Sequence, residues 1–274
     1  MANIKSSLKA KSGNAFTLQA VDTSNHQYQL AVKNFNNRAV ACRRQKDFTC
    51  AIKNYNNALR IDRGFAVLYN NRGVACLEKK AFDRAISDFD RALTIAPDMG
   101  IAYYNRGIAW RAEKKLNRAI DDFTRALKAL PDLARAYNNR GEAYDEKGET
   151  ELAIKDFTRA IDLKPGFAAA YNNPGESRYE TGDLESAEAD YQKALQLNPA
   201  FAAAYYNRGR LRLDKGDTNR AIADFKKALK IDPGFSRAHR ILCRLLPSES
   251  NLRIDGEVGV LAFEKKRSKN PEAD

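Results

Sequence analysis

The chain repeats itself with a period of 34 residues. Four sets of identical residues keep this step: Tyr69, Tyr103, Tyr137, Tyr171 and Tyr205; Gly73, Gly107, Gly141, Gly175 and Gly209; Ala85, Ala119, Ala153, Ala187 and Ala221; Pro97, Pro131, Pro165, Pro199 and Pro233. A period of this length predicts a fold in which copies of one supersecondary unit stack and contact their neighbours. It also favours an extended binding surface over a single catalytic pocket.

Each repeat has the pattern of two helices. In residues 100–133, Tyr103 and Gly107 lie four residues apart in the first half, and Ala119 and Phe123 do so in the second. This spacing puts side chains on one face of a helix. The proline near the end of the last five repeats ends the second helix, and a glycine between the halves, where one is present, ends the first. Neither helix can bury its apolar face alone, so neighbouring hairpins must stack.

These residues resemble the tetratricopeptide repeat (TPR) family, whose pattern has an aromatic residue, Leu-Gly, Tyr, Ala, an aromatic residue and Pro at fixed offsets. The resemblance covers six repeats: 32–65, 66–99, 100–133, 134–167, 168–201 and 202–235. It implies an all-α solenoid, a right-handed superhelix of stacked helix-turn-helix hairpins. We therefore expect residues 1–24 to be a flexible leader, 25–235 to hold the repeats, 236–246 to form a cap helix and 247–274 to be a flexible tail.

One departure from the family pattern is systematic. Where the family has Leu before the glycine, this chain has an arginine. The resulting Asn-Arg-Gly motif resembles that of bacterial TPR proteins. The arginines are Arg38, Arg72, Arg106, Arg140 and Arg208, and aspartates recur on the second helix as Asp88, Asp122, Asp156, Asp190 and Asp224. A charge repeated near a packing face needs a partner, so each arginine is predicted to pair with an aspartate of its own or an adjacent hairpin. The alternative is a solvated face.

In the TPR family the first helices line a concave groove. At the matching positions this chain has asparagines one period apart: Asn37, Asn71, Asn105, Asn139, Asn173 and Asn207. A primary amide can donate and accept, so such a row can hold the backbone of an extended peptide. The row is similar to the asparagine ladder of the O-GlcNAc transferase repeats. The alternative is that some of these asparagines only bond neighbouring helices.

The predicted groove is charged differently along its length. The first three repeats place Lys33, Arg43, Arg44 and Arg111 in it, against Glu78. The last three place there Glu142, Asp145, Glu146, Glu176, Glu180 and Asp214, against Arg135 and Arg210. Tyr104, Tyr179 and Tyr206 offer flat contact area, or are ordinary surface residues. The sequence thus predicts a protein or peptide partner whose two halves have complementary charge.

Nucleic-acid binding is the alternative function. The formal net charge of the chain is +12, and a basic stripe is predicted on the second helices: Arg91, Arg125, Arg159, Lys193 and Lys227. A solvated face explains the same stripe. No Ser-His-acid set, metal-ligand cluster or phosphate-binding loop occurs, so we expect neither an enzyme nor a cofactor. No apolar stretch approaches the ~20 residues of a membrane span.

The four cysteines read as free thiols. Cys42 and Cys76 occupy the slot that holds Trp110 in a later repeat, which predicts small buried apolar residues. Cys50 and Cys243 have no nearby cysteine or histidine at metal-ligand spacing. This pattern suits a reducing compartment, and we expect a cytoplasmic location.

The fifth repeat departs from the others. Pro174 stands in place of the arginine there. Because proline removes a backbone donor and restricts the residue before it, we expect a kinked or late-starting helix, with Asn173 out of line with the other asparagines.

Overall fold

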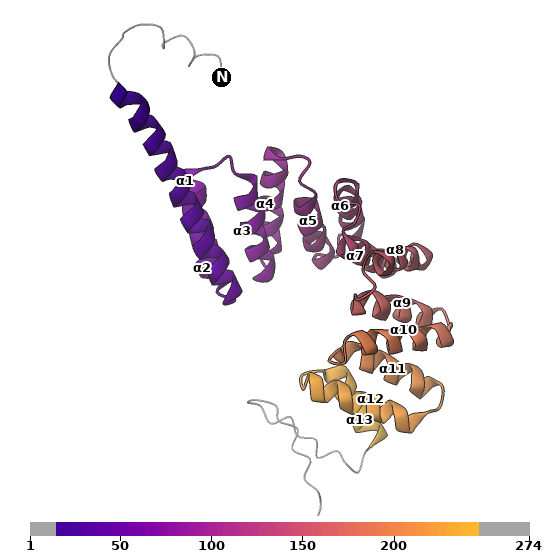
Figure 1. Ribbon diagram of the computed structural model, residues 1–274. Coiled ribbons are helices and arrows are strands. Elements are labelled where there is room, and N and C mark those ends of the chain that lie inside the picture. Colours follow the sequence, from indigo (N-terminus) through magenta and orange to yellow (C-terminus); the bar gives the residue numbers. More distant parts are fainter. Residues whose placement is uncertain (1–14, 247–274) are drawn as a thin grey trace, which may run out of the picture. The chain divides into compact units, whose positions relative to one another are not determined.

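The computed structural model describes residues 15–246, and for residues 15–25 only the backbone. Thirteen α-helices and no strands occur in that range (Figure 1). The chain is an all-α solenoid of helical hairpins, as predicted. It divides into two compact units, residues 1–131 (unit 1) and 132–274 (unit 2). The predicted tail, 247–274, lies outside the described residues.

Unit 1 contains three hairpins. Their helices are α1 (Ala15–Arg44) with α2 (Phe48–Ile61), α3 (Ala66–Glu78) with α4 (Phe82–Ile95), and α5 (Gly100–Ala112) with α6 (Leu116–Ala129). The second helix of one hairpin packs against the first helix of the next, α2 on α3 and α4 on α5. The helix α1 begins inside the segment 1–24 that we expected to be a leader.

Unit 2 repeats this plan and adds one helix. Its hairpins are α7 (Ala134–Glu146) with α8 (Thr150–Leu163), α9 (Ala168–Glu180) with α10 (Leu184–Leu197), and α11 (Ala202–Asp214) with α12 (Thr218–Ile231). The helix α13 (Ser236–Leu245) then packs against α12. The side chains of Ala238 and Leu242 bury the apolar face of α13.

The repeated glycine is required by the ring that packs against it. A Cβ atom on Gly107 would lie 2.7 Å from the ring of Phe123, and one on Gly73 would lie 2.6 Å from the ring of Phe89. Both rings are fully buried between the two helices of their hairpin. The glycine therefore sets how closely the helices approach, and the ring fills the space between them.

The predicted arginine–aspartate pairs are confirmed for four of the five arginines, and Arg38, which is exposed and has Asn54 at the position of the aspartate, is the exception. Arg106 donates from Nε and Nη2 to the two carboxylate oxygens of Asp122, both at 2.7 Å. The same two-bond pair joins Arg72 to Asp88, Arg140 to Asp156 and Arg208 to Asp224. Arg106 also reaches the preceding hairpin, where its Nη1 bonds Asp90 at 2.5 Å. Bidentate bonds of this kind fix the position of the guanidinium group as well as its charge.

The prediction for Pro174 is wrong in two respects. The helix α9 runs without a break from Ala168 to Glu180 and includes Pro174. Asn173 still donates its side-chain amide to Asn138 of the preceding hairpin at 3.1 Å, so it is in line. The packing of the hairpin determines the helix despite the missing backbone donor. The lost arginine is replaced from one turn further along, where Arg178 forms the ion pair with Asp190.

The turns inside the hairpins differ between the units. The residue with left-handed backbone angles is a lysine in unit 1, namely Lys46, Lys80 and Lys114, with φ of 60°, 61° and 59°. In unit 2 it is a glycine, namely Gly148, Gly182 and Gly216, with φ of 79°, 88° and 82°. Only glycine adopts these angles without steric cost.

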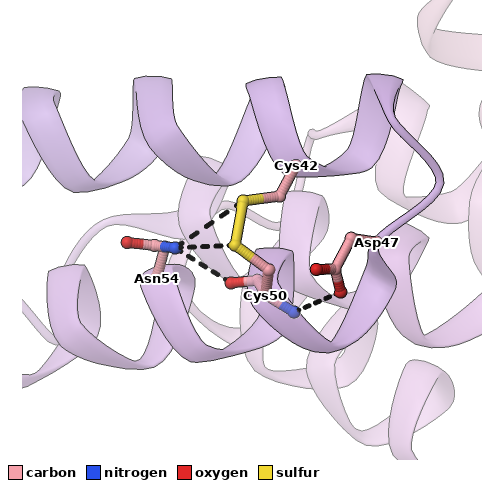
Figure 2. Close-up of a disulfide and its surroundings, with 4 residues drawn as sticks. All are labelled: Cys42, Asp47, Cys50 and Asn54. Atoms are coloured by element: carbon pink, nitrogen blue, oxygen red, sulfur yellow. Dashed lines mark hydrogen bonds between the residues drawn. A yellow bond between two sulfur atoms is a disulfide. The ribbon is translucent and has the colours of Figure 1, made fainter.

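The prediction of four free thiols is wrong for two of them. Cys42 of α1 and Cys50 of α2 form a disulfide (Figure 2). They are only eight residues apart, but the tight turn between the two helices brings their Cα atoms to 5.8 Å. Asn54 donates to the carbonyl of Cys50 at 3.0 Å beside the bridge. Cys76 is free and buried, as predicted. Cys243 is also free, but its Sγ lies 3.7 Å from Nδ1 of His239, a neighbour that the sequence analysis missed.

Candidate functional site

Each unit has its own row of groove asparagines on its first helices. We call Asn37, Asn71 and Asn105 the unit 1 row and Asn139, Asn173 and Asn207 the unit 2 row. Because the residues of a row come from the same position of successive hairpins, they share one face of the helices. Asn37 is exposed and the other five are half-buried.

The unit 1 row is held by hydrogen bonds between hairpins. Asn105 on α5 donates from Nδ2 to Oδ1 of Asn70 on α3 at 2.9 Å. Asn71 makes the same bond to Asn36 on α1 at 3.4 Å. Asn70 is only 6 % exposed, so its carbonyl oxygen needs this partner. The alternative of bonding between neighbouring helices therefore describes one N–H of Asn71 and one N–H of Asn105.

The unit 2 row is held in the same way. Asn207 donates to Asn172 at 3.3 Å. Asn173 donates to Oδ1 of Asn138 at 3.1 Å and to Oε1 of Glu142 at 2.8 Å. These bonds orient the row. Within the described part of the chain they leave Oδ1 of Asn105 and of Asn207 without a donor.

The residues that accept these bonds were missed by the sequence analysis. They precede a row asparagine as the first member of an Asn-Asn pair: Asn36, Asn70, Asn138 and Asn172. The signal was present, because a doublet one period apart predicts two different roles for its members. Where the doublet is broken, tyrosine stands in the first position, as Tyr104 and Tyr206.

Two of the three predicted contact tyrosines, Tyr104 and Tyr206, pack mainly inward. The ring of Tyr206 lies 5.9 Å from that of Phe225 and 5.2 Å from that of Phe235, and Tyr206 is 8 % exposed. It therefore offers a ligand little surface. Tyr104 is half-buried against Phe123 at 6.0 Å.

The charged residues predicted for the groove are partly buried or exposed, and some of them form ion pairs within their own unit. Arg111 in unit 1 is half-buried, and in unit 2 Glu142 is half-buried and Glu146 is exposed. In unit 1, Nε of Arg43 lies 3.9 Å from Glu78. In unit 2, Arg210 pairs with Glu176 at 2.7 Å.

Unit 2 carries an excess of carboxylates on this face. Asp145 accepts a hydrogen bond from Oγ of Ser177 at 2.7 Å, and Tyr179 donates to Asp214. Burial raises the pKa of the Asp145 carboxyl group, and the nearby carboxylates of Glu176 and Glu146 raise this pKa further. Burial, then Asp145 and Glu176, also raises the pKa of Glu180. Negative charge is thus concentrated on α7, α9 and α11, the helices that carry the unit 2 row.

Unit 1 has a cavity that the sequence analysis missed. Its volume is about 850 Å³, and we call it the N-terminal pocket. Its main walls are Tyr28, Val32 and Lys33 of α1, Ile61 at the end of α2, and Phe65 and Leu68 at the start of α3. It forms because α1 extends beyond the first repeat, so that Tyr28 stands where later repeats have a turn. Asn36, which bonds the unit 1 row, also lines it.

The structure offers no sign of metal chemistry or of a membrane span within residues 26–246. No three His, Cys, Asp or Glu side chains gather there in a way that could hold a metal ion. No described helix is both long enough and apolar enough to cross a bilayer.

Models of the tetratricopeptide repeat match three segments of the chain. They cover residues 66–99 and 134–167, and a further model covers residues 175–234. The first two ranges coincide with repeats drawn from the sequence. None of the curated proteins is similar enough to be counted as a relative.

Solved structures with similar folds include MamA, YrrB and PilF. MamA is 27% identical over 59% of this chain and 94% of its own, with a TM-score of 0.54. YrrB, titled a TPR protein with an unusual peptide-binding site, is 23% identical over 68% and 96%, with a TM-score of 0.52. PilF of Pseudomonas aeruginosa is 15% identical over 80% and 99%, with a TM-score of 0.68. The last two show likeness of fold alone.

Proposed function

Because the chain is a tetratricopeptide-repeat protein, we propose that it is a non-enzymatic scaffold in which the asparagine row of each unit binds an extended segment of a partner protein. Repeats of this family serve as protein-interaction scaffolds. The observation that carries the finer proposal is the set of hydrogen bonds holding each row. Asn105 and Asn207 each use one N–H on a neighbouring hairpin and keep Oδ1 available. An amide oriented in this way can bond a peptide unit with little loss of side-chain entropy.

The charge of each face would set which part of the partner it meets. In unit 2 the carboxylates of Asp145, Glu180 and Asp214 form no ion pair with any described cation. In unit 1, Lys33, Arg43 and Arg44 have the opposite sign. The face of unit 2 would therefore select a basic part of the partner, and the face of unit 1 would select an acidic part.

Photo-crosslinking tests this proposal. A photoreactive residue is placed at Ile101, one turn before Asn105 on the same helix face, or at Asp121, which is exposed on the second helix α6. The proposal expects partner segments to be crosslinked from Ile101 and not from Asp121. Equal crosslinking from both positions contradicts binding along the row.

A matched pair of variants separates binding from stability. Asn105→Ala removes the row amide and leaves Asn70 with an unbonded oxygen, whereas Asn70→Ala removes only the partner. Both should lower the melting temperature, because each breaks the same bond. Asn105→Ala should weaken partner binding by about tenfold, whereas Asn70→Ala, which keeps the row amide but no longer orients it, should weaken binding less. Equal loss of binding in both would show that the asparagines are structural.

Nucleic-acid binding is a second candidate because the predicted basic stripe is exposed. Arg91 and Arg125 in unit 1 and Arg159, Lys193 and Lys227 in unit 2 all lie at the surface. Affinity for RNA that falls steeply with salt, and falls further when these residues are changed to glutamine, would support it. The cytoplasmic location remains a prediction, and the disulfide argues against it because disulfides persist in oxidising compartments.

A further inference from the structure

Two aromatic side chains in the wall of the N-terminal pocket are largely exposed to solvent. Tyr28 is 63 % exposed and Phe65 is 47 % exposed. Phe65 precedes the first residue of α3, and Phe235 has the same place before α13 in unit 2. There the ring of Tyr206 covers Phe235 at 5.2 Å. The residue that matches Tyr206 beside Phe65 is Asn36, which has no ring to offer.

The pocket is continuous with the unit 1 row. Lys33 in its wall lies one helical turn before Asn37, so both lie on one face of α1. Val67 and Ile101 have the same place before Asn71 and Asn105, and they are 45 % and 37 % exposed. The matching residues of unit 2 beside Asn173 and Asn207 are Ala169 and Ala203. Unit 1 therefore presents an exposed apolar strip beside its row, and unit 2 does not. Together with the exposed rings of Tyr28 and Phe65, these side chains enlarge the apolar surface that a partner can cover.

The charge around the pocket favours an acidic ligand. Among the residues whose side chains are described, no carboxylate forms an ion pair with Lys33. The one carboxylate in the wall, Asp62, accepts a hydrogen bond from the backbone N–H of Gly64 at 2.8 Å and so is held in its turn. Arg43 and Arg44 follow on the same helix, and the contact of Arg43 with Glu78 is a long one, with 3.9 Å between Nε and Oε2.

We propose that the N-terminal pocket binds one aromatic or branched aliphatic side chain of an extended acidic peptide whose backbone continues along the unit 1 row. This rests on the proposed function and names the class of segment that unit 1 selects. The volume of about 850 Å³ lies within the range of roughly 300–1,000 Å³ typical of ligand pockets, so it admits the anchor side chain together with the adjoining peptide units. The side chain fills the gap between Tyr28 and Phe65, and the carboxylates of the peptide neutralise Lys33. An apolar anchor surrounded by complementary charge is the usual composition of a binding hot spot.

The first test uses three fluorescein-labelled peptides and the full chain. The probe is a dodecapeptide of glycine, aspartate and glutamate with one central phenylalanine. One control has alanine for the phenylalanine, and the other has lysine for every acidic residue. Fluorescence anisotropy should show binding of the probe at least about tenfold tighter than that of either control. If the alanine peptide binds as tightly as the probe, the pocket does not hold the anchor and the proposal is overturned.

The second test uses variants with a matched control. Phe65→Ser removes one wall of the pocket, and Phe167→Ser makes the same change at the equivalent position of unit 2. Phe65→Ser should weaken binding of the probe about tenfold, while Phe167→Ser should change it less than about twofold. Lys33→Glu should weaken the acidic probe and strengthen the lysine peptide. Circular dichroism melting identifies any variant that loses binding because it unfolds. Lys33 is exposed, so Lys33→Glu should keep the fold and tests the charge of the pocket even if Phe65→Ser unfolds.

Other occupants give different results. If removing residues 1–14 tightens probe binding, the protein's own N-terminal segment fills the pocket, and the proposed ligand is wrong. If Phe65→Ser instead abolishes self-association in sedimentation, a second copy fills it, and the proposal is equally overturned. The proposed function is tested separately, since crosslinking from Ile101 with no effect of Phe65→Ser would retain the scaffold and reject the pocket.

Discussion

Units 1 and 2 are built from the same repeat, and they differ at the positions of the repeat that do not pack the two helices together. Both bury an aromatic ring against a glycine and hold an aspartate with an arginine. Unit 1 has a disulfide, lysines in its left-handed turns and an apolar strip beside its row. Unit 2 has glycine turns, a proline inside a helix and a carboxylate-rich face. The shared residues thus determine the fold, and the differing ones determine what each unit can bind.

The largest expected difference concerns the buried ion pairs. Asp122 in unit 1 is 3 % exposed and bonded by one arginine, Arg106, whereas Asp224 in unit 2 is bonded by both Arg208 and Arg212. Arg106→Leu should therefore destabilise the chain by about 3–5 kcal/mol, because it strands a buried charge. Arg208→Leu should cost less than half of that. Urea unfolding measures both.

A control for this prediction exists in the first repeat. Arg38 occupies the same position, but it is exposed and Asn54 stands where the aspartate would be. Arg38→Leu should change the unfolding free energy by less than about 0.5 kcal/mol. If the Arg106 and Arg208 variants lose the same unfolding free energy, Arg212 does not stabilise the Asp224 charge when Arg208 is absent.

The disulfide is expected to have the next largest effect, confined to unit 1. Cys42 and Cys50 are eight residues apart. A cross-link closing a loop of that length stabilises a protein by about 2.5 kcal/mol in the chain-entropy account. Reduction should therefore speed hydrogen exchange of α1 and α2 and leave α8 to α12 unchanged. Four reactive thiols in the untreated, denatured protein would show that the bridge is absent.

The sequence predicted the hairpins and the arginine–aspartate pairs because both follow from residues repeated at a fixed step. It failed where one residue's partner is set by tertiary packing. Pro174 predicted a disturbed helix, but hairpin packing and Arg178 keep α9 and its ion pair in place. Cys42 and Cys50 looked independent because helical periodicity does not show how closely a turn brings two helices together. The N-terminal pocket depends on the length of α1 beyond the repeat, which no periodic pattern reports.

The left-handed turn residue of one unit can be replaced by that of the other with a single substitution. Lys80 in unit 1 has φ of 61°, and Gly182 in unit 2 has φ of 88°. Left-handed angles cost a residue with a side chain about 1 kcal/mol relative to glycine. Lys80→Gly should therefore raise the unfolding free energy by up to about 1 kcal/mol, and Gly182→Lys should lower it by a similar amount. A loss of stability in Lys80→Gly would show that the lysine side chain contributes more than its backbone costs.

The smallest effect should come from the acidic face of unit 2 and should depend on pH. Burial raises the pKa of the Asp145 carboxyl above its ordinary value of 3.8, so the folded chain holds this proton more tightly than the unfolded chain does. The stability from this group is then present at low pH and is lost as pH rises from about 4 through the raised pKa. Asn cannot titrate, so Asp145→Asn should gain melting temperature relative to the wild type at pH 7 but not at pH 4. The surface variant Asp121→Asn serves as the unit 1 control. If Asp145→Asn melts lower than the wild type at pH 7, the bond from Ser177 outweighs the cost of burying the Asp145 charge beside Glu176, and this carboxylate is stable without a cationic partner.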